Sequence, residues 1–365
     1  MPFDAIFVPD AMREAVSDRA WLGAMLAAEV ALARAQARVG LIPAEAAHEV
    51  AEACRPEHFH IEALMREARS AGNPVPALVN AAGNEWLHEG ATSQDIVDTA
   101  AMLVARDALK LIGTDLDGVA AACARLAREH RDTPMPGRTL MQRAEPTTFG
   151  LKAAGWLVAV LDGREWLRAL RLPAQLGGAA GTLASMGGHG PAVLGELAKQ
   201  LGLDEPPIPW HTNRTLPATL GAALAVTAGA LAKIALDVEL LAQTEVGEVS
   251  SGSGESSSMP HKRNPVEAIR ARACATRVQA AAGLLMSGVA AHEHERAAGA
   301  WHAEWAPLCE ALACTGGAAA ATREMLEGLE VHPERMRENL GEVDLGPHVT
   351  AAAALVERAL ARYRR

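Results

Sequence analysis

Aromatic residues and cysteines are scarce in this chain. Phenylalanine, tryptophan and tyrosine together make up 3% of its 365 residues, and it has five cysteines. The cysteines, at positions 54, 123, 274, 309 and 314, are scattered, odd in number and include no Cys-x-x-Cys pair. This pattern argues against a disulfide framework and predicts reduced thiols, as is typical of cytoplasmic proteins.

A basic surface and a targeting segment are also missing. The formal net charge is −10, so binding to nucleic acid or to an anionic membrane surface is not expected. The N-terminus, Met1-Pro-Phe-Asp, has neither the basic nor the apolar region of a signal peptide. Residues 216–232 carry no charge, but they contain Pro217 and many Ala and Gly residues, which favours a buried bundle helix over a membrane span. We therefore expect a cytoplasmic protein.

Convincing β-strand patterns are absent, whereas helical periodicity runs through most of the chain. Half of the residues are apolar, mainly Ala, Leu and Val, and Gly and Pro residues punctuate the periodic stretches. The sequence therefore predicts an all-α fold. After an amphipathic helix at residues 10–39, we expect long helices at residues 95–130, 147–171, 216–249, 265–290 and 303–328.

These helices suggest three parts. A small N-terminal helical domain would span residues 1–93, a central long-helix bundle residues 94–330, and a short C-terminal helical tail residues 331–365. The helix expected at 216–249 would be about 50 Å long and is apolar nearly all round, with Lys233, Asp237 and Glu239 as its few mid-helix charges. Such a helix must be covered on every side. One chain can hardly do this, so we predict an obligate homo-oligomer.

The most informative stretch is the run Ser256-Ser-Ser-Met-Pro-His-Lys-Arg-Asn-Pro265. The hydroxyl-rich and glycine-rich segment before it, in the predicted loop 250–265, has too little apolar surface to dock. Directly after it comes a strong helix former. The start of a helix favours an anion, and Lys262 adds a full positive charge beside it. The run therefore predicts chemistry on a carboxylate substrate.

Three separated segments together resemble the fumarase/aspartase superfamily, which includes class-II fumarases and argininosuccinate and adenylosuccinate lyases. The run 256–265 resembles its flexible catalytic loop. The segment His88-Glu-Gly-Ala-Thr-Ser-Gln-Asp95 looks like its first substrate-binding segment, and Gly137-Arg-Thr-Leu-Met-Gln-Arg-Ala144 like its second. The resemblance covers most of the chain. It implies an oligomer, expected to be a tetramer, whose active sites draw on several subunits.

The resemblance also implies roles for individual residues. Ser256 would be the catalytic acid and base, while Lys262 and Asn264 would stabilise the charge that develops on the substrate carboxylate. The remaining candidates would bind a dicarboxylate or tricarboxylate substrate; they are His88, Thr92, Ser93, Gln94, Arg138, Thr139, Gln142, His211, Arg214, Ser257 and Met259. Two alternatives stay open, because Thr92, Ser93 or Gln94 could simply cap a helix and Arg214 could form a surface ion pair.

Neither a metal nor a cofactor is expected. His292 and His294 are two residues apart, which does not place both on one helix face, and neither cysteines nor a convincing set of acids complete a site with His302. The run Gly177-Gly-Ala-Ala-Gly181 lacks the Lys-Ser/Thr and the preceding strand of a phosphate loop. In the superfamily this stretch lies near the active site, so close backbone approach is the better interpretation.

Within the superfamily, the segments 209–212, 243–249, 259–265 and 294–305 are most similar to the bacterial 3-carboxy-cis,cis-muconate cycloisomerases. This similarity implies an isomerase that closes 3-carboxy-cis,cis-muconate to a carboxymuconolactone in protocatechuate (β-ketoadipate) degradation. The adenylosuccinate lyases carry a proton-donating His where this chain has Leu140, which argues against release of an amine. The alternative is a β-elimination lyase of the same superfamily that releases fumarate from a substituted succinate.

Overall fold

The computed structural model describes residues 3–251, 254–255 and 263–364. In the described part the α-helices are α1 (Asp4–Phe7), α2 (Asp10–Ala15), α3 (Asp18–Arg38), α4 (Ala44–Ala53), α5 (Ile61–Glu67), α6 (Val75–Ala82), α7 (Ser93–Glu129), α8 (Phe149–Arg168), α9 (Gly190–Leu201), α10 (Thr215–Leu241), α11 (Val266–Ser287), α12 (Ala300–Ala303), α13 (Trp305–Glu327), α14 (Pro333–Leu340) and α15 (Gly346–Tyr363). The strands are β1 (Pro134–Thr139), β2 (Gln142–Thr148), β3 (Val249–Ser250), β4 (Gly254–Glu255), β5 (Arg263–Asn264) and β6 (Glu330–Val331). The predicted all-α fold is confirmed.

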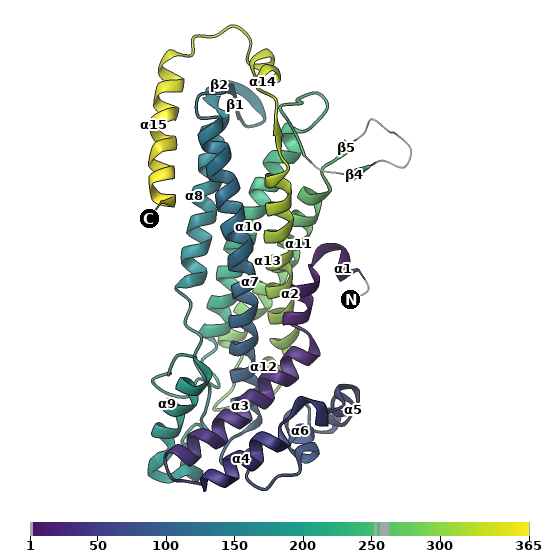
Figure 1. Cartoon of the computed structure of the whole chain (residues 1–365), viewed down its shortest axis with the longest axis vertical. Coiled ribbons are helices and arrows are strands. Elements are labelled where there is room, and N and C mark those ends of the chain that lie inside the picture. Colours follow the sequence, from purple (N-terminus) through teal and green to yellow (C-terminus); the bar gives the residue numbers. More distant parts are fainter. Residues whose placement is uncertain (1–2, 252–253, 256–262, 365) are drawn as a thin grey trace.

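Five long helices, α7, α8, α10, α11 and α13, form an elongated bundle that runs the length of the molecule (Figure 1). Their shared core consists mainly of Ala, Leu and Val side chains, which allow the helices to pack closely. At Gly317 on α13, a β-carbon would lie 2.5 Å from the backbone oxygen of Phe7. Only glycine therefore lets the N-terminal segment cross the bundle at this point.

A second core lies at the lower end of the bundle, where α3, α4, α6 and α9 gather (Figure 1). It also takes in the start of α7, through Ile96 and Val97, and Trp301 from the far end of the sequence. The predicted division at residue 93 stays a prediction, since this lower core draws on segments from both sides of it.

Two expected helices begin or end differently in the structure. The helix predicted at 10–39 is divided, because the Ser17 side chain accepts a hydrogen bond from the Ala20 N–H and starts α3 there. The helix predicted at 216–249 ends at Leu241. Gly247, with a φ of 60°, turns the chain, and Val249 then pairs with Val331. The tertiary pairing of residues 248–250 overrides the helical pattern of the sequence.

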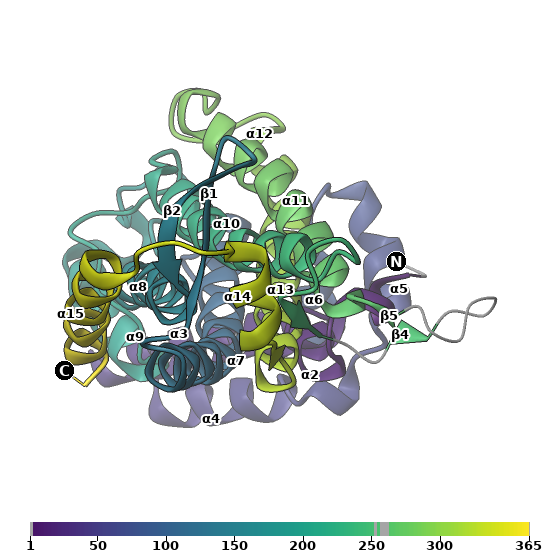
Figure 2. The same ribbon diagram turned by 90° about the horizontal axis from the view of Figure 1, so that it is seen from above.

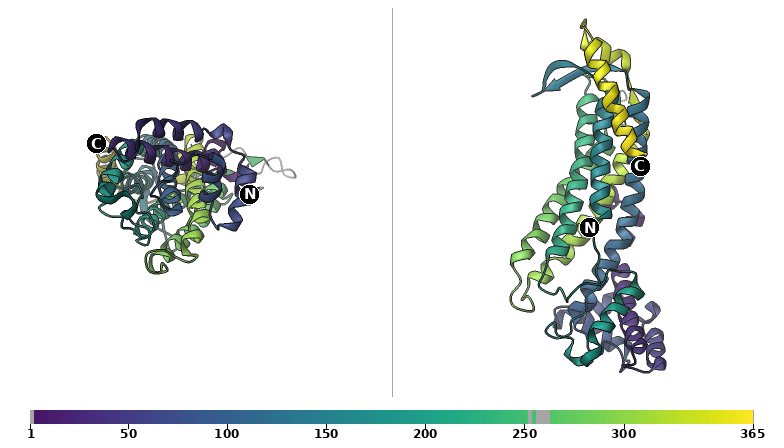
Figure 3. Two further views of the ribbon diagram at one scale, coloured as in Figure 1. Left: turned by 90° about the horizontal axis from the view of Figure 1, so that it is seen from below. Right: turned by 90° about the vertical axis from the view of Figure 1, so that its left-hand side faces the viewer.

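The prediction that strand patterns are absent is wrong for one segment. Strands β1 and β2 form an antiparallel hairpin that projects from the upper end of the bundle, away from the N-terminal helices (Figures 2 and 3). Gly137 makes a bulge in β1, and a β-carbon there would lie 2.5 Å from the Glu145 backbone oxygen. Polar residues and prolines hide the alternating pattern of this hairpin in the sequence.

Helix α10 is the one described helix that is long and apolar enough to cross a membrane by length and composition. More than half of its most apolar stretch is buried inside the chain. Val226 and Leu236 lie on its outward face, and α11 adds Ile269 and Leu284 beside them as further exposed apolar side chains. The burial of this stretch agrees with the prediction that the segment is a helix of the bundle and not a membrane span.

Candidate active site

Helix α7 begins at the segment that the sequence identifies as substrate-binding. Thr92 and Asp95 form a capping box, in which an Asp95 carboxylate oxygen lies 2.9 Å from the Thr92 nitrogen. The helix-capping alternative is therefore confirmed for Thr92. Ser93 opens the helix, and Gln94 is fully buried behind it. The free N–H groups of this first turn suit an anion.

Asp95 holds this segment together with two distant parts of the chain. Its fully buried carboxylate accepts hydrogen bonds from the N–H groups of Gly177 and Gly178, both at 2.9 Å, and lies 2.6 Å from Nε2 of His211. A β-carbon at Gly177 would come within 2.7 Å of His211 Cε1, so the glycine is required for this approach. The structure thus brings His211 and the loop at residues 177–181 to the start of α7.

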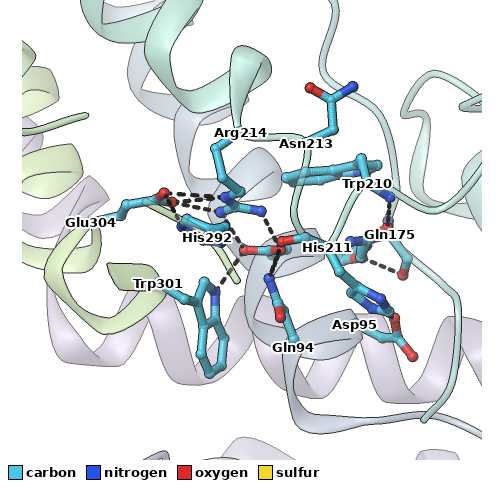
Figure 4. Close-up of polar contacts among 12 residues, drawn as sticks. Gln94, Asp95, Gln175, Trp210, His211, Asn213, Arg214, His292, Trp301 and Glu304 are labelled. Atoms are coloured by element: carbon cyan, nitrogen blue, oxygen red, sulfur yellow. Dashed lines mark hydrogen bonds and ion pairs between the residues drawn. The ribbon is translucent and has the colours of Figure 1, made fainter. Parts of the chain in front are cut away.

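Arg214 lies near the start of α7, in a buried network of ion pairs (Figure 4). Its guanidinium donates to Asp98 at 2.7 and 3.0 Å and to Glu304 at 2.6 and 3.1 Å, and it stacks over the Trp210 ring. Although burial alone would lower the pKa of Arg214, the two carboxylates raise it. The surface ion pair considered from the sequence is wrong, because Arg214 is buried. Its contact with a substrate stays a prediction.

Neighbouring side chains complete this network. The Trp301 indole donates to Asp98 at 3.0 Å, and Gln94 donates both to Asp98 at 3.1 Å and to the His211 carbonyl at 2.8 Å. The His292 ring lies 3.2 Å from Glu304, and burial lowers its pKa despite that neighbour. In the described part of the chain, no group of three or more His, Cys, Asp and Glu residues is placed to hold a metal.

Arg296 is a further candidate functional residue, which no motif in the sequence singles out. Its guanidinium donates to the Gln94 side-chain oxygen at 3.1 Å and to the carbonyls of Gly178 and Ala179 at 3.1 and 2.8 Å. This guanidinium therefore links the first predicted substrate-binding segment to the loop at residues 177–181. The segment 294–305, which carries part of the family resemblance, was the only signal for it.

His88 forms a dyad with Glu29 of α3. Its Nδ1 lies 2.7 Å from the fully buried Glu29 carboxylate. Burial alone would lower the pKa of His88, but the hydrogen bond and the charge of Glu29 outweigh it and raise the pKa. His88 also has a φ of 65°, an unusual conformation for this residue. Folding therefore favours the protonated form of the His88 ring.

The second segment predicted to bind substrate lies at the opposite end of the bundle. Arg138 forms a bidentate pair with the buried Glu248, which itself accepts a hydrogen bond from Asn339. Thr139 and Gln142 are exposed, and between them Leu140 and Met141 form the turn with exposed fractions of 96% and 72%. Nothing in this subunit covers them among the described residues.

Asn264 is the one predicted catalytic residue in the described part of the chain. It lies in β5, which pairs with β4, and precedes α11 at the upper end of the bundle (Figure 1). Ser256, Ser257, Met259 and Lys262 lie outside the described residues. Helix α7 has 37 residues, so about 55 Å separates the Thr92 segment from the end that carries the hairpin. One subunit therefore does not unite the three predicted segments.

Comparisons with known proteins agree with this architecture. A sequence model of the family described as "Lyase" matches residues 8–280. The chain is 44% identical to 3-carboxy-cis,cis-muconate cycloisomerase of Pseudomonas aeruginosa over 99% of this chain and 81% of that protein. The chain belongs to the fumarate lyase superfamily. The resemblance predicted from the three segments is confirmed, and the chain is an enzyme of the cycloisomerase-like type within that superfamily.

Two further relatives narrow the comparison within the fumarate lyase superfamily. The chain is 51% identical to the nitrosuccinate lyase of Streptomyces davaonensis, over 89% of this chain and 74% of that protein. The crystal structure of the 3-carboxy-cis,cis-muconate lactonizing enzyme from Pseudomonas putida has a TM-score of 0.88 and 40% identity, over 100% of this chain and 88% of that chain. The lactonizing enzyme therefore shares the long-helix fold over most of its length.

Proposed function

We propose that this enzyme interconverts 3-carboxy-cis,cis-muconate and a carboxymuconolactone in protocatechuate degradation. The observation that carries the proposal is the match with the cycloisomerases, at 44% identity over 99% of this chain for the protein of Pseudomonas aeruginosa and a TM-score of 0.88 for the structure from Pseudomonas putida. The apolar hairpin tip is compatible with it, because Leu140 stands at the position of a proton-donating His in the adenylosuccinate lyases. Leucine cannot protonate a leaving group. The site therefore suits a group that departs, or adds, as a stable anion, and a substrate carboxylate is such a group.

The chemistry is an addition across a double bond. A carboxylate oxygen of the substrate bonds to one alkene carbon, and the electron pair moves to the carbon next to another carboxylate. Ser256 then delivers a proton to that carbon, and the carbon–hydrogen bond forms. In the reverse direction Ser256, as an alkoxide, removes the same proton, and the carboxylate oxygen leaves.

Charge stabilisation is the main task of the remaining residues. Removal of a proton next to a carboxylate gives a dianion, which needs preorganised donors around it. Lys262 and Asn264 would supply them in the loop that precedes α11. The first turn of α7, with Thr92 and Ser93, would hold another carboxylate of the substrate through its free N–H groups. Ser257 and Met259 would line the same site.

A complete site requires more than one subunit. The Thr92 segment and the hairpin lie at opposite ends of α7. Apolar side chains on α10 and α11 are also exposed, and contact with another subunit would bury them. We propose a homotetramer in which the hairpin and the loop of other subunits meet the α7 start. This assembly would act in the cytoplasm on small carboxylate substrates.

A second candidate function is elimination of nitrite from nitrosuccinate. The 51% identity with the nitrosuccinate lyase of Streptomyces davaonensis specifically favours it. Nitrite also departs as a stable anion, so Leu140 is equally compatible with this reaction. The two candidates share proton removal next to a carboxylate and differ in the group that leaves.

Parallel assays of the two substrates test the proposal. Purified enzyme given 3-carboxy-cis,cis-muconate should remove its diene absorbance and form the lactone. Ser256→Ala should lower kcat by roughly a thousandfold, because the proton donor is lost, while gel filtration shows an unchanged oligomer. No lactone together with rapid nitrite release from nitrosuccinate would instead establish the second candidate.

A further inference from the structure

Helix α3 carries two buried polar side chains, Glu29 and Gln36, among its apolar ones. They are seven residues apart, which places them on one face of the helix. Both contact the turn that precedes α7: Oε1 of Glu29 lies 2.7 Å from Nδ1 of His88, and the Gln36 amide donates to the Glu89 carbonyl at 2.7 Å. This face of α3 therefore holds residues 88–89 in place.

Only one oxygen of the Glu29 carboxylate has a partner. Its Oε2 is buried and makes no hydrogen bond with any residue that the structure describes. Such an oxygen destabilises the fold, because it has lost its water without gaining a donor. An apolar side chain at this position of α3 would avoid the penalty. Core stability therefore does not explain Glu29, and its contact with His88 is the feature that does.

The contact with Glu29 determines which hydrogen bonds the His88 ring can make. Because Nδ1 faces a carboxylate, it carries a hydrogen, and Nε2 is the nitrogen left for other contacts. Nε2 has no partner in the described part of the chain, and 19% of the side chain is exposed. In the neutral ring Nε2 can only accept a hydrogen bond, whereas in the protonated ring it donates one. Only protonated His88 can therefore bind a carboxylate through Nε2.

The charged groups around the ring favour this protonated form. Burial lowers the pKa of His88, but the hydrogen bond and charge of Glu29 and the charge of Asp95 raise it, and the upward shift prevails. Asp95 belongs to the capping box at the start of α7, together with Thr92. A carboxylate bound at this first helical turn would meet a charged donor in His88.

We propose that Glu29 is a positioning residue, which orients His88 and keeps its Nε2 a charged donor to a substrate carboxylate at the start of α7. The inference rests on the proposed function in one respect, that the α7 start holds a carboxylate, and it does not depend on which group leaves. Glu29 itself does not touch the substrate. Carboxylate binding should be tightest at low pH and should weaken as the pH rises and His88 loses its proton.

Calorimetric titration of the intact oligomer with fumarate, at pH values from about 6 to about 9, tests this role. Glu29→Gln keeps an acceptor for Nδ1 but loses the charge, so His88 should lose its proton at a lower pH. Near pH 7 the variant should bind fumarate about tenfold more weakly, since a charge-assisted hydrogen bond is lost. Identical pH profiles of Glu29→Gln and wild type, or no saturable binding by the wild type, would overturn the inference.

Further variants separate this role from a structural one. His88→Asn lacks Nε2, and asparagine tolerates the left-handed backbone at this position. It should bind fumarate weakly at every pH, and adding Glu29→Gln should weaken binding no further. A further loss in the double variant would show that Glu29 acts through the fold. Gln36→Leu removes the other contact of α3 with the turn, so it should lower the melting temperature without moving the pH profile.

Turnover assays keep this inference distinct from the proposed function. A wild type that converts neither 3-carboxy-cis,cis-muconate nor nitrosuccinate would refute the proposed function, while fumarate binding would still test Glu29. Conversely, wild-type turnover of either substrate, together with identical fumarate profiles for wild type and Glu29→Gln, would refute the role of Glu29 alone.

Discussion

Buried carboxylates fix the geometry at the lower end of the molecule. Asp95 accepts a hydrogen bond from the Gly177 N–H and contacts His211. Asp98 and Glu304 both form ion pairs with Arg214. Removing one partner of a buried ion pair typically costs about 3–5 kcal/mol, because the other charge stays buried without compensation. These residues therefore hold the backbone of the predicted substrate-binding segment in place.

The Glu29–His88 dyad makes a testable contribution to stability. Its raised folded pKa means that folding favours protonated His88, so this stability is present below the ordinary pKa of 6.5 and is lost as pH rises through the folded pKa. Glu29→Gln should therefore lower the melting temperature most at acid pH. The difference from wild type should shrink as the pH rises above about 6.5 and through the raised pKa of His88.

Thermal unfolding followed by circular dichroism across this pH range measures the effect. Glu52→Gln is a matched control, since Glu52 is exposed and contacts only Arg55 among the described residues. It should reproduce the wild-type pH profile. A Glu29→Gln difference that is constant with pH would show that Glu29 stabilises the fold without its interaction with His88.

Among the elements, the β1–β2 hairpin has the most unusual local structure. Leu140 and Met141 have φ values of 51° and 64°, in the left-handed region that favours Gly and Asn. Two large apolar side chains in that conformation, both exposed, do not serve the stability of this subunit. Strain of this kind is found at functional sites, where contacts elsewhere compensate for it.

A double substitution separates stability from function at this turn. Leu140→Asn with Met141→Gly should stabilise the hairpin by about 1–2 kcal/mol, because the strain of two left-handed residues is relieved. If the tip contacts substrate in a neighbouring subunit, kcat/KM should nevertheless fall. Met141→Gly alone keeps Leu140 and should retain more activity. A stabilised double variant with full activity would place the tip away from the active site.

At the scale of the whole molecule, α7 acts as a spacer between parts of the proposed site. The α7 start, with Thr92, and the upper end, with the hairpin and Asn264, lie far apart in one subunit (Figure 1). The exposed apolar faces of α10 and α11 run along the length between them. Association through such faces would bring the upper end of one subunit to the lower end of another.

Subunit mixing tests this arrangement. Ser93→Ala and Ser256→Ala should each impair turnover, and oligomers refolded from equal amounts of both should regain activity in about a quarter of the sites, since segments combine at random. Ser256→Ala mixed with Asn264→Ala is the control, because both changes affect one loop and no intact loop can form. Failure of the first mixture to regain activity would argue that each site lies within one subunit.

Some features escaped sequence analysis for physical reasons. The hairpin was missed because residues 134–148 are too polar and proline-rich to show alternation. The end of α10 at Leu241 was missed because Glu248 and Val249 are held by partners far along the chain, Arg138 and Val331. Arg296 was not singled out, since its contacts with Gln94 and Gly178 exist only after the loops have packed.

The sequence alone determined the helical class, the family and the residue types available for chemistry. Helical periodicity and the order of motifs can be recognised along the chain without knowing how the helices pack. Only the tertiary structure decided the partners: Arg214 meets Asp98 and Glu304, Glu248 meets Arg138, and Glu29 meets His88. Distances between segments depend on how long helices pack, and no pattern along the chain encodes them directly.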